Sequence, residues 1–442
     1  MAILRVKYTT PLIWIPVILI LASAAQGREL SFAESLDLAA RDATELQTLD
    51  AEQDIAEGAY QRSAQAFLPR IRGDVTWLRA DSSLIQDIPV PEIGLPPRIV
   101  LRDYGPVEGV ASSVQVVQPV LHVDAWKARK QADLVREARR LARRWGGEVV
   151  QVSVAARYFA VAVHERSVAA ARMSVQAARH ALHLAHASYR EGVVAKVDVY
   201  RASAELEGAR ARLSSEEAEW RAARIDLATL LGLPSHDDVI LTSPLPEPSP
   251  PVEPATSAAP RTDFRAAEIQ LDAADAGLER EAARWLPRVN MVARQQWFDG
   301  REPFNVNSEG WLLAVNLQWT LFEGMDRKGA IAEAKARRRL SRIELEQVRR
   351  EVVRDQEQTR SDWHAAWSAW QASGKALESA TIAATLARRQ YEEGVGSMND
   401  MLVTQALLHQ RQVDHVRLQY RAFMVSMNVY LAHGLDPLEA FP

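Results

Sequence analysis

The sequence contains no cysteine among its 442 residues, and this absence excludes several kinds of chemistry. Disulfide frameworks, thiolate metal sites, cysteine nucleophiles and an acylated cysteine at a mature amino terminus are all ruled out. Glycine and proline are scarce, with 20 and 21 residues, which favours long helices over many short strands. The 53 basic and 57 acidic side chains leave a net charge of −4, which argues against a generally basic nucleic-acid binder.

Residues 1–25 have the pattern of a secretory signal peptide. Arg5 and Lys7 give a short basic start, an apolar run follows from Leu12 to Leu21, and small residues stand at 22–25. A membrane-spanning helix needs about 20 apolar residues, so we predict cleavage here in preference to a retained anchor. No later stretch reaches that length, so any membrane span of the exported protein would consist of strands.

The rest of the chain is an internal duplication. Four short landmarks recur in the same order, and two pairs of glycines share an offset of 202 (394 − 192 and 434 − 232). Ordered recurrence indicates two structural repeats, which we place at residues 26–243 and 261–442, joined by a proline-rich linker at 244–260. The landmark pairs are Tyr189-Arg190-Glu191-Gly192-Val193 with Tyr391-Glu392-Glu393-Gly394-Val395, Leu231-Gly232-Leu233 with His433-Gly434-Leu435, Gln118-Pro119-Val120-Leu121 with Gln318-Trp319-Thr320-Leu321, and Phe67-Leu68-Pro69-Arg70 with Trp285-Leu286-Pro287-Arg288.

Each repeat is predicted to contain a helix, two strands, a long helix and a shorter return helix. A helix over 124–190 would span about 100 Å at about 1.5 Å per residue. The two shorter helices together match this length, so we expect them to stack end to end along it, between strands at one end and a glycine break at the other. Gly146 and Gly147 lie inside the long helix and predict a bend or a point of close packing. The expected helices are Ser31–Ala66 (with a turn near Asp42), Asp124–Arg190, Asp198–Leu231, Thr262–Trp285, Asp326–Tyr391 and Asp400–His433, and the expected strands are Arg70–Ala80, Gly109–Val120, Arg288–Phe298 and Glu309–Leu321.

The segment from residue 309 to 321 carries the clearest membrane signal. Trp311, Leu313, Val315, Leu317 and Trp319 alternate with other residues and would share one face of a strand. The two tryptophans would lie about 26 Å apart, close to the apolar band of about 25 Å between the aromatic girdles of outer-membrane barrels. We predict that this face contacts lipid and that the opposite, polar face lines a water-filled lumen. A closed barrel needs about eight strands or more, so we expect three chains to contribute about twelve.

With Asp198 and Asp400 following the two glycine breaks, the landmarks above give the chain beyond the signal a resemblance to the TolC-like family of outer-membrane efflux proteins. The resemblance implies a mainly α fold with a membrane β-barrel. In such a homotrimer, four strands per chain form a twelve-stranded barrel in the outer membrane of a Gram-negative bacterium, and a long antiparallel α-helical coiled-coil tunnel extends into the periplasm. The residues that carry the resemblance are the breaks Tyr189/Gly192/Asp198 and Tyr391/Gly394/Asp400, together with Phe67-Leu68-Pro69, Gln118-Pro119-Val120-Leu121 and Leu230-Leu231-Gly232.

The same resemblance implies a function. The protein would be the outer-membrane duct of a tripartite efflux or type I secretion system, exporting substrates passively with a periplasmic adaptor and an inner-membrane pump. No cofactor, metal or nucleic acid is implied. The sequence also has no phosphate-binding loop, nucleophile elbow or His-Glu-x-x-His pattern, so we expect no enzymatic activity.

The resemblance also assigns roles to five residues at the two breaks. Asp198, Tyr391 and Asp400 match positions of a periplasmic gate, where aspartates face the pore. Gly192 and Gly394 would form the turns that dock on the adaptor. These turns are expected at the end of the rod that lies farthest from the strands.

Two departures from the family pattern concern that gate. The position of the gate arginine is Gly396, and Val403 stands where a second aspartate is found. The salt-bridge network of well-known members is therefore not reproduced. On spacing grounds alone, Lys196 is the candidate substitute.

Two further patterns have alternative interpretations. One pattern is the spacing i, i+3, i+6 of His180, His183 and His186, which indicates either a metal site or a polar helix surface. No carboxylate joins them at i+4, so the polar surface is favoured. Met398 and Met401 suit either soft Cu(I) or ordinary packing, and packing is favoured.

One alternative stays open for the chain as a whole. A soluble periplasmic coiled-coil scaffold, whose strands form a small sheet, would have the same long helices. Fractionation with the outer membrane separates the two interpretations. The sequence does not identify a cargo, because drugs, solvents, metal cations and polypeptides all use such ducts.

Overall fold

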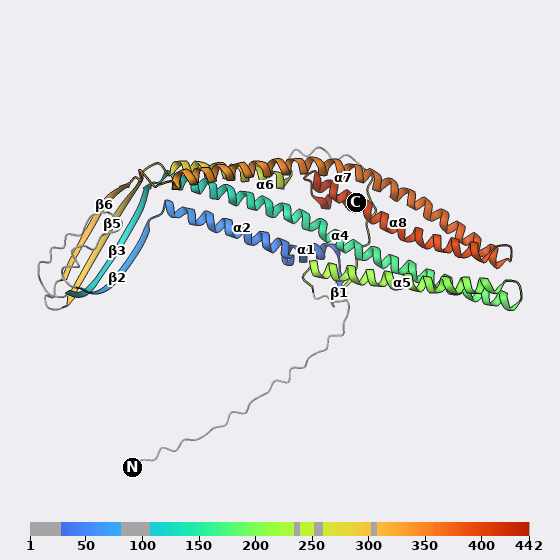
Figure 1. Ribbon diagram of the computed structural model, residues 1–442. Helices are drawn as coiled ribbons and strands as arrows, with labels where there is room; N and C mark the ends of the chain where they lie inside the picture. The colour runs from blue at the N-terminus through green and yellow to red at the C-terminus, as the bar shows by residue number, and fades with distance from the viewer. Residues whose placement is uncertain (1–27, 81–106, 234–238, 252–259, 302–306, 442) are drawn as a thin grey trace, which may run out of the picture.

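The computed structural model describes residues 28–80, 107–233, 239–251, 260–301 and 307–441. The predicted signal peptide lies outside the described residues, as does the part of the predicted linker at 252–259. The described chain is a rod of long helices with a four-stranded sheet at one end (Figure 1). The elements are β1 (Arg28–Leu30), α1 (Phe32–Asp42), α2 (Thr44–Ser63), η1 (Ala64–Ala66), β2 (Arg70–Ala80), β3 (Val107–Leu121), α4 (Val123–Arg190), α5 (Lys196–Leu230), β4 (Val239–Leu241), α6 (Thr262–Ala283), β5 (Arg288–Arg301), β6 (Asn307–Gln318), α7 (Asp326–Glu392), α8 (Met398–Ala432) and η2 (Pro437–Ala440).

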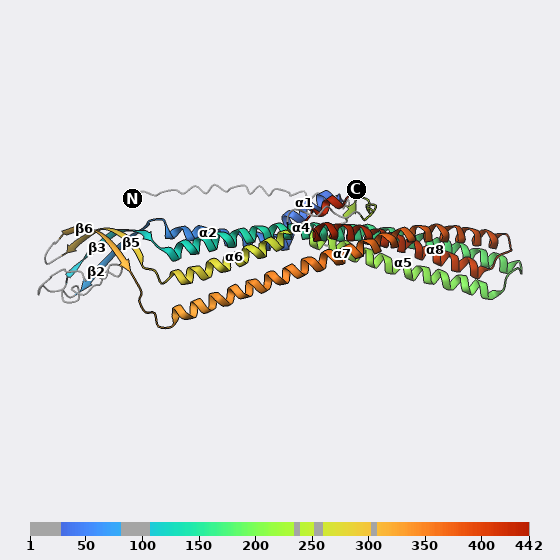
Figure 2. The ribbon, with the colours of Figure 1, turned by 90° about the horizontal axis from the view of Figure 1, so that it is seen from above.

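Two long helices set the length of the rod. Helices α4 and α7 contain 68 and 67 residues, so each is about 100 Å long. Helices α2 and α5 both pack along α4, and α6 and α8 both pack along α7, as Figures 1 and 2 show. The prediction that two shorter helices line each long one is therefore confirmed. The strands lie at one end of the rod and the helix-to-helix turns at the other.

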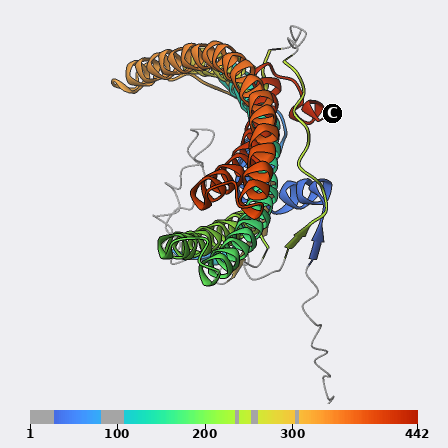
Figure 3. The same cartoon turned by 90° about the vertical axis from the view of Figure 1, so that its right-hand side faces the viewer.

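The helices form a curved layer. Viewed along the rod, they lie on an arc, as Figure 3 shows. Helix α4 also packs against α6 and α8, which joins the two halves of the chain into a continuous layer. None of the helices in the described ranges combines the length and the apolar character needed to cross a membrane.

Small residues allow the helices to approach closely. The buried positions of α4 include many alanines, and Gly146 lies against Leu49 of α2. A Cβ atom added at Gly146 would collide with the Leu49 Cδ1 atom. Because α4 continues through Gly146 and Gly147 without a break, the structure supports the close-packing interpretation of this glycine pair.

The largest apolar cluster lies near the middle of the rod. Tyr158 and Phe159 of α4 pack with Phe32, Phe423 and Phe441. The cluster therefore packs α1, the middle of α4, the second half of α8 and the end of the described chain against one another.

The tyrosine of this cluster also ties the small β1–β4 sheet to the rod. The Tyr158 hydroxyl donates to the Leu30 carbonyl at 2.8 Å and accepts from the Ser243 N–H at 3.0 Å. Strands β1 and β4 are parallel and have three residues each. This sheet was not predicted from the sequence, because strands of that length leave no periodic pattern.

The larger sheet has the strand order β2-β3-β5-β6, and every neighbouring pair is antiparallel. All four strands were predicted at the places where the structure has them. The last one was predicted to reach Leu321, but β6 ends at Gln318. The chain then turns through Gly324, with a φ of +62°, into α7.

Candidate functional site: the two ends of the rod

The register of the sheet places the large, exposed apolar residues of the four strands on one face, the apolar face. Leu313 of β6 pairs with Ala293 of β5, and Ala293 in turn pairs with Val116 of β3. Val116 pairs with Ile71 of β2, and Trp311 is 79% exposed. The exposed large hydrophobic residues of this face are Ile71, Val75, Trp77, Val114, Met291, Trp297, Trp311, Leu313, Val315 and Leu317.

The opposite face, the polar face, carries charged, amide and hydroxyl side chains, together with apolar residues such as Val292 and Leu312. Arg72 of β2 pairs with Gln115 of β3, and Gln115 pairs with Arg294 of β5. Two residues further along β2, Asp74 pairs with Ser113. The two faces therefore differ in the way that a boundary between lipid and water requires.

Trp319 lies just beyond β6 and outside the strand alternation. Its Nε1–H donates to the Trp285 carbonyl at 3.0 Å, and the two rings meet edge to face. In the first half of the chain, Gln118 Nε2 donates to the Phe67 carbonyl at 2.9 Å. The aligned landmarks of the duplication therefore contact each other in both halves, where the strands join the helices.

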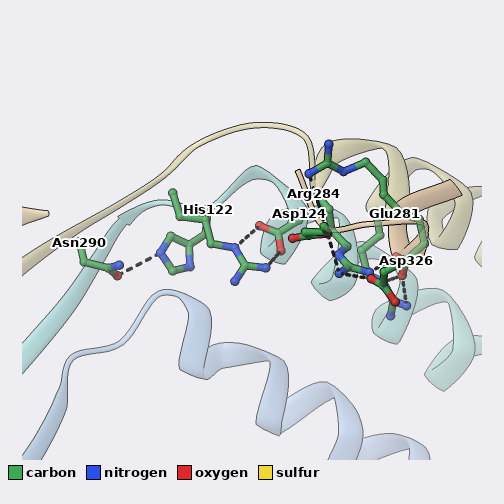
Figure 4. Close-up of polar contacts among 10 residues, drawn as sticks. His122, Asp124, Glu281, Arg284, Asn290 and Asp326 are labelled. Atoms are coloured by element: carbon green, nitrogen blue, oxygen red, sulfur yellow. Dashed lines mark hydrogen bonds and ion pairs between the residues drawn. The ribbon is translucent and has the colours of Figure 1, made fainter. Parts of the chain in front are cut away.

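Polar contacts connect the sheet to the rod at this junction, as Figure 4 shows. Arg288 Nε donates to Asp124 Oδ1 at 3.3 Å, and His122 Nε2 lies 3.0 Å from Asn290 Oδ1. A second group joins α6 to α7, where an Arg284 nitrogen donates to an aspartate oxygen at the start of α7 at 2.9 Å. These contacts fix the direction in which the strands leave the helical layer.

Glu281 at this junction has a lowered pKa. Its partial burial opposes ionisation, but hydrogen bonds from Arg280 and Arg284 outweigh that effect and hold the pKa of the carboxyl below its usual value. The carboxylate is therefore an ionised partner of two arginines at neutral pH.

At the other end of the rod, the two helix-to-helix turns have the same backbone geometry. Gly192 and Gly394 have φ values of +74° and +77°, in the left-handed region that favours glycine. Their N–H groups donate to the Tyr189 and Tyr391 carbonyls at 3.1 and 3.0 Å. A Cβ added at either glycine would meet no atom of the described chain within 4 Å. Backbone conformation, and not packing within the chain, therefore requires glycine here.

Gly396, which the resemblance aligned with a gate arginine, is a glycine for a different reason. A Cβ added there would lie 2.9 Å from Gln390 Cβ and 3.0 Å from the Tyr391 backbone nitrogen. The Gly396 N–H also donates to the Gln390 carbonyl at 2.9 Å. The second turn is therefore folded back on the end of α7 so tightly that it has no room for a side chain at this position.

Tyr391 lies inside the packing between the two hairpins. It is 8% exposed and belongs to a buried cluster with alanines of α4 and α5 and with apolar residues of α8. Burial raises the pKa of its hydroxyl, and the Asp198 carboxylate also raises it. Met398 and Met401 belong to the same cluster, which agrees with the packing interpretation of these methionines.

The two aspartates occupy the first turns of the return helices. Ser397 Oγ donates to the Asp400 carboxylate at 2.7 Å and accepts from the Asp400 N–H at 3.0 Å, so this pair caps α8. The Ser-x-x-Asp spacing is the sequence signal for such a cap, but the cap was not predicted from the sequence. Asp198 Oδ1 lies 3.4 Å from an Arg201 nitrogen of its own helix. The Lys196 ammonium lies 5.6 Å from the centroid of the Tyr200 ring.

The histidine pattern on α4 forms an exposed stripe. His180 lies 3.9 Å from a Glu392 oxygen, and His183 and His186 are exposed beside it. Within the described residues, these three rings do not form a group with metal-ligand geometry.

A different group of side chains has ligand atoms close enough for a metal ion. It consists of His164, Glu216 and Glu219, whose ligand atoms lie within 4.8 Å of one another. This group was not predicted from the sequence, because its residues come from two different helices, α4 and α5. An Arg417 nitrogen lies 3.2 and 3.6 Å from the two carboxylates and already neutralises charge there.

Comparison with known proteins agrees with this architecture. A model of the family described as "Outer membrane efflux protein" matches residues 36–233 and 255–434. The structure is similar to the Campylobacter jejuni CmeC outer membrane channel, with a TM-score of 0.76 at 12% identity over 91% of this chain and 85% of that one. It is also similar to the outer membrane protein VceC of Vibrio cholerae, with a TM-score of 0.74 at 17% identity over 91% and 96% of the two chains.

Two relatives are similar in sequence. The pyoverdine export outer membrane protein OpmQ of Pseudomonas putida is 25% identical over 71% of this chain and 68% of its own length. Nodulation protein T of Rhizobium leguminosarum bv. trifolii is 23% identical over 66% of this chain, and the match spans 63% of that relative.

The architecture, long helices with four antiparallel strands at one end, is that of the TolC-like channel structures. The predicted fold class, mainly helical with four antiparallel strands, is therefore confirmed. The chain belongs to the outer membrane efflux protein family, whose model matches both of its halves. This is a family of channels and not of enzymes.

Proposed function

We propose that three copies of this chain form the outer-membrane duct of a tripartite efflux or secretion system. The duct is passive, and an inner-membrane pump, linked to it by a periplasmic adaptor, drives transport. In this proposal a signal peptide at 1–25 directs export, and two repeats at 26–243 and 261–442 flank the linker at 244–260.

The observation that carries this proposal is the unclosed, two-faced sheet. Its outer strands β2 and β6 each pair on one side only within the described chain. Because neighbouring strands alternate in direction, β6 of one copy can pair antiparallel with β2 of the next. Three copies of four strands would close a barrel of about twelve, and the apolar face would then contact lipid, with Trp319 at the periplasmic border.

The turns at the far end of the rod are the proposed gate and docking region. Asp198 and Asp400 lie in the first turns of α5 and α8, so three copies would bring their carboxylates around one axis. Tyr391 would hold the two hairpins of a chain together. With Gly396 in place of the gate arginine, we propose that this gate opens more easily than one held by salt bridges.

The adaptor would meet the exposed tips of the two turns. Val193 and Val395 follow the turn glycines, and Val395 is 78% exposed. Apolar side chains at the tip of a rod suit contact with the apolar surface of another protein. Because the open space around Gly192 and Gly394 is not filled by the described chain itself, a partner backbone can approach there.

Membrane fractionation and conductance measurements test this proposal together. The full-length protein should be recovered from outer membranes as a heat-modifiable trimer, and the purified trimer should conduct ions across planar lipid bilayers. Recovery as a soluble monomer that gives no conductance would contradict the channel and favour the periplasmic scaffold.

A further inference from the structure

The charges of the polar face are unevenly distributed. Among the strand residues that the structure describes, this face carries four arginines and one carboxylate. The carboxylate is Asp74, and Arg288 is already paired with Asp124 at the junction with the rod. The polar face therefore has a net positive charge, although the whole chain is slightly acidic at −4. The four arginines are Arg70, Arg72, Arg288 and Arg294.

Two of these arginines lie in one row across the sheet, with Gln115 between them. The register pairs Arg72 with Gln115 and Gln115 with Arg294. Neighbouring strands are about 4.8 Å apart, so the two arginine backbones are about 10 Å apart. Asp74 belongs to the adjacent row on the same face, opposite Ser113. We call Arg72, Gln115 and Arg294 the arginine row.

Arg294 is held in place and keeps hydrogen-bonding capacity. Its Nη2 group donates to Ser113 Oγ at 3.3 Å, and a guanidinium has five N–H donors in all. Gln115 beside it is buried. A guanidinium fixed at one corner, with further N–H donors, can bind a planar carboxylate or a phosphate oxygen.

We infer that the arginine row is an anion site in the lumen of the barrel, which favours the passage of small molecules bearing carboxylate or phosphate groups. The inference rests on the proposed trimeric duct, in which the polar face lines the lumen. Three copies would then place six arginines around the lumen at one level, and rings of arginine in a pore wall attract anions. Weak, repeated attraction of this kind raises the local anion concentration without trapping the cargo.

The arginine row lies far from the carboxylates of the two helix-to-helix turns. Asp198 and Asp400 lie at the end of the rod farthest from the sheet, whereas the arginine row lies inside the sheet. A probe that enters from the sheet end passes Asp74 in the adjacent row and reaches the arginine row without crossing the rod. This arrangement allows the site to be tested from one side of a membrane.

The test uses the full-length trimer in planar lipid bilayers and tripolyphosphate as the probe. Tripolyphosphate added on the sheet side should cause brief, concentration-dependent closures that weaken as the salt concentration rises. The double variant Arg72→Gln/Arg294→Gln should need at least about tenfold more probe for the same block, because six positive charges are removed from the lumen. Arg294→Lys, which keeps the charge, should retain most of the block. Arg79→Gln is the matched control, because Arg79 lies on the apolar face.

The outcomes separate this inference from the proposed duct. Conducting trimers that show no block from the sheet side, or equal block in wild type and the double variant, would overturn the arginine row as an anion site. A chain that forms no conducting trimer would instead contradict the duct itself. If the double variant does not assemble, the block by tripolyphosphate is compared between wild type and the single variant Arg294→Gln, which removes three of the six charges.

Discussion

Local chemistry explains the roles of single residues at the helix-to-helix turns and at the junction between the rod and the sheet. At the turns, Gly192 and Gly394 are required by a positive φ, so a bulky substitution there would strain the backbone whatever its effect on a partner. Val395 is the better position for a docking test, because it is exposed and its replacement leaves the turn glycine in place. At the junction with the sheet, Glu281 is a carboxylate held between two arginines.

Glu281 should make the stability of the rod dependent on pH. Because the folded-state pKa of this carboxyl is lowered, its stabilising contribution is present above the ordinary value of 4.5 and is lost as the pH falls through the lowered pKa. Glu281→Gln should reduce stability at pH 7 by roughly 1–3 kcal/mol, with a smaller loss at acid pH. Thermal unfolding of both proteins between about pH 7 and pH 3 measures this difference, and an equal loss at every pH would contradict the role of the charge.

At the tip, Val395→Asp should weaken docking without preventing assembly. A charge in an apolar contact must be desolvated, so we expect loss of adaptor binding and of export while heat-modifiable trimers remain. Val193→Asp tests the other turn, and the two variants should differ in severity because the turns differ in sequence after the glycine. Normal adaptor binding by both variants would show that the tips are not the docking site.

At the scale of elements, the strands of the sheet are distinguished by their two faces. Leu313 lies with its neighbours on the exposed apolar face, while Gln296 of the adjacent strand lies on the polar face. The alternation along each strand was visible in the sequence, but the pairing of four strands into one apolar surface needed the register.

The two faces should respond differently to an added charge. Leu313→Arg should cost about 2–4 kcal/mol in the membrane-inserted state, because it places a charge on the lipid face. Gln296→Arg, which faces the lumen in the proposed barrel, should be tolerated. The amount of heat-modifiable trimer in outer membranes measures both effects, and equal loss for the two variants would mean that the faces are assigned incorrectly.

At the scale of the whole molecule, the described chain has an open shape that the proposed trimer would close. The helices lie on an arc, and the sheet has two outer strands that pair on one side only in the described chain (Figure 3). In the part of the rod nearer the sheet, the helices pack side by side in the order α2, α4, α6, α7. Helices α2 and α7 are therefore the two edges of the layer there. Ile343 of α7 is 55% exposed and Ile55 of α2 is 69% exposed. Exposed apolar side chains on bordering helices suit packing against a further copy.

We therefore predict that the rods of neighbouring copies contact each other. Ile343→Asn should destabilise the trimer by about 1.5–3 kcal/mol for each lost apolar contact, so the trimer band should dissociate at a lower temperature. Gln347→Ala, one helical turn away at another exposed position, is a control that removes no apolar side chain. If both variants lower the dissociation temperature equally, or neither does, Ile343 makes no apolar contact between copies.

The sequence by itself determined the elements of this protein, because they depend on local and periodic signals. The absence of helix breakers predicted α4 and α7, the alternation predicted the four strands, and the paired glycine breaks predicted both turns. Only the tertiary structure decided how distant residues meet. The β1–β4 pair under Tyr158, the burial of Tyr391 and the row formed by Arg72 and Arg294 all join segments far apart in the chain. Such contacts depend on packing and register, which leave no local pattern in a single sequence.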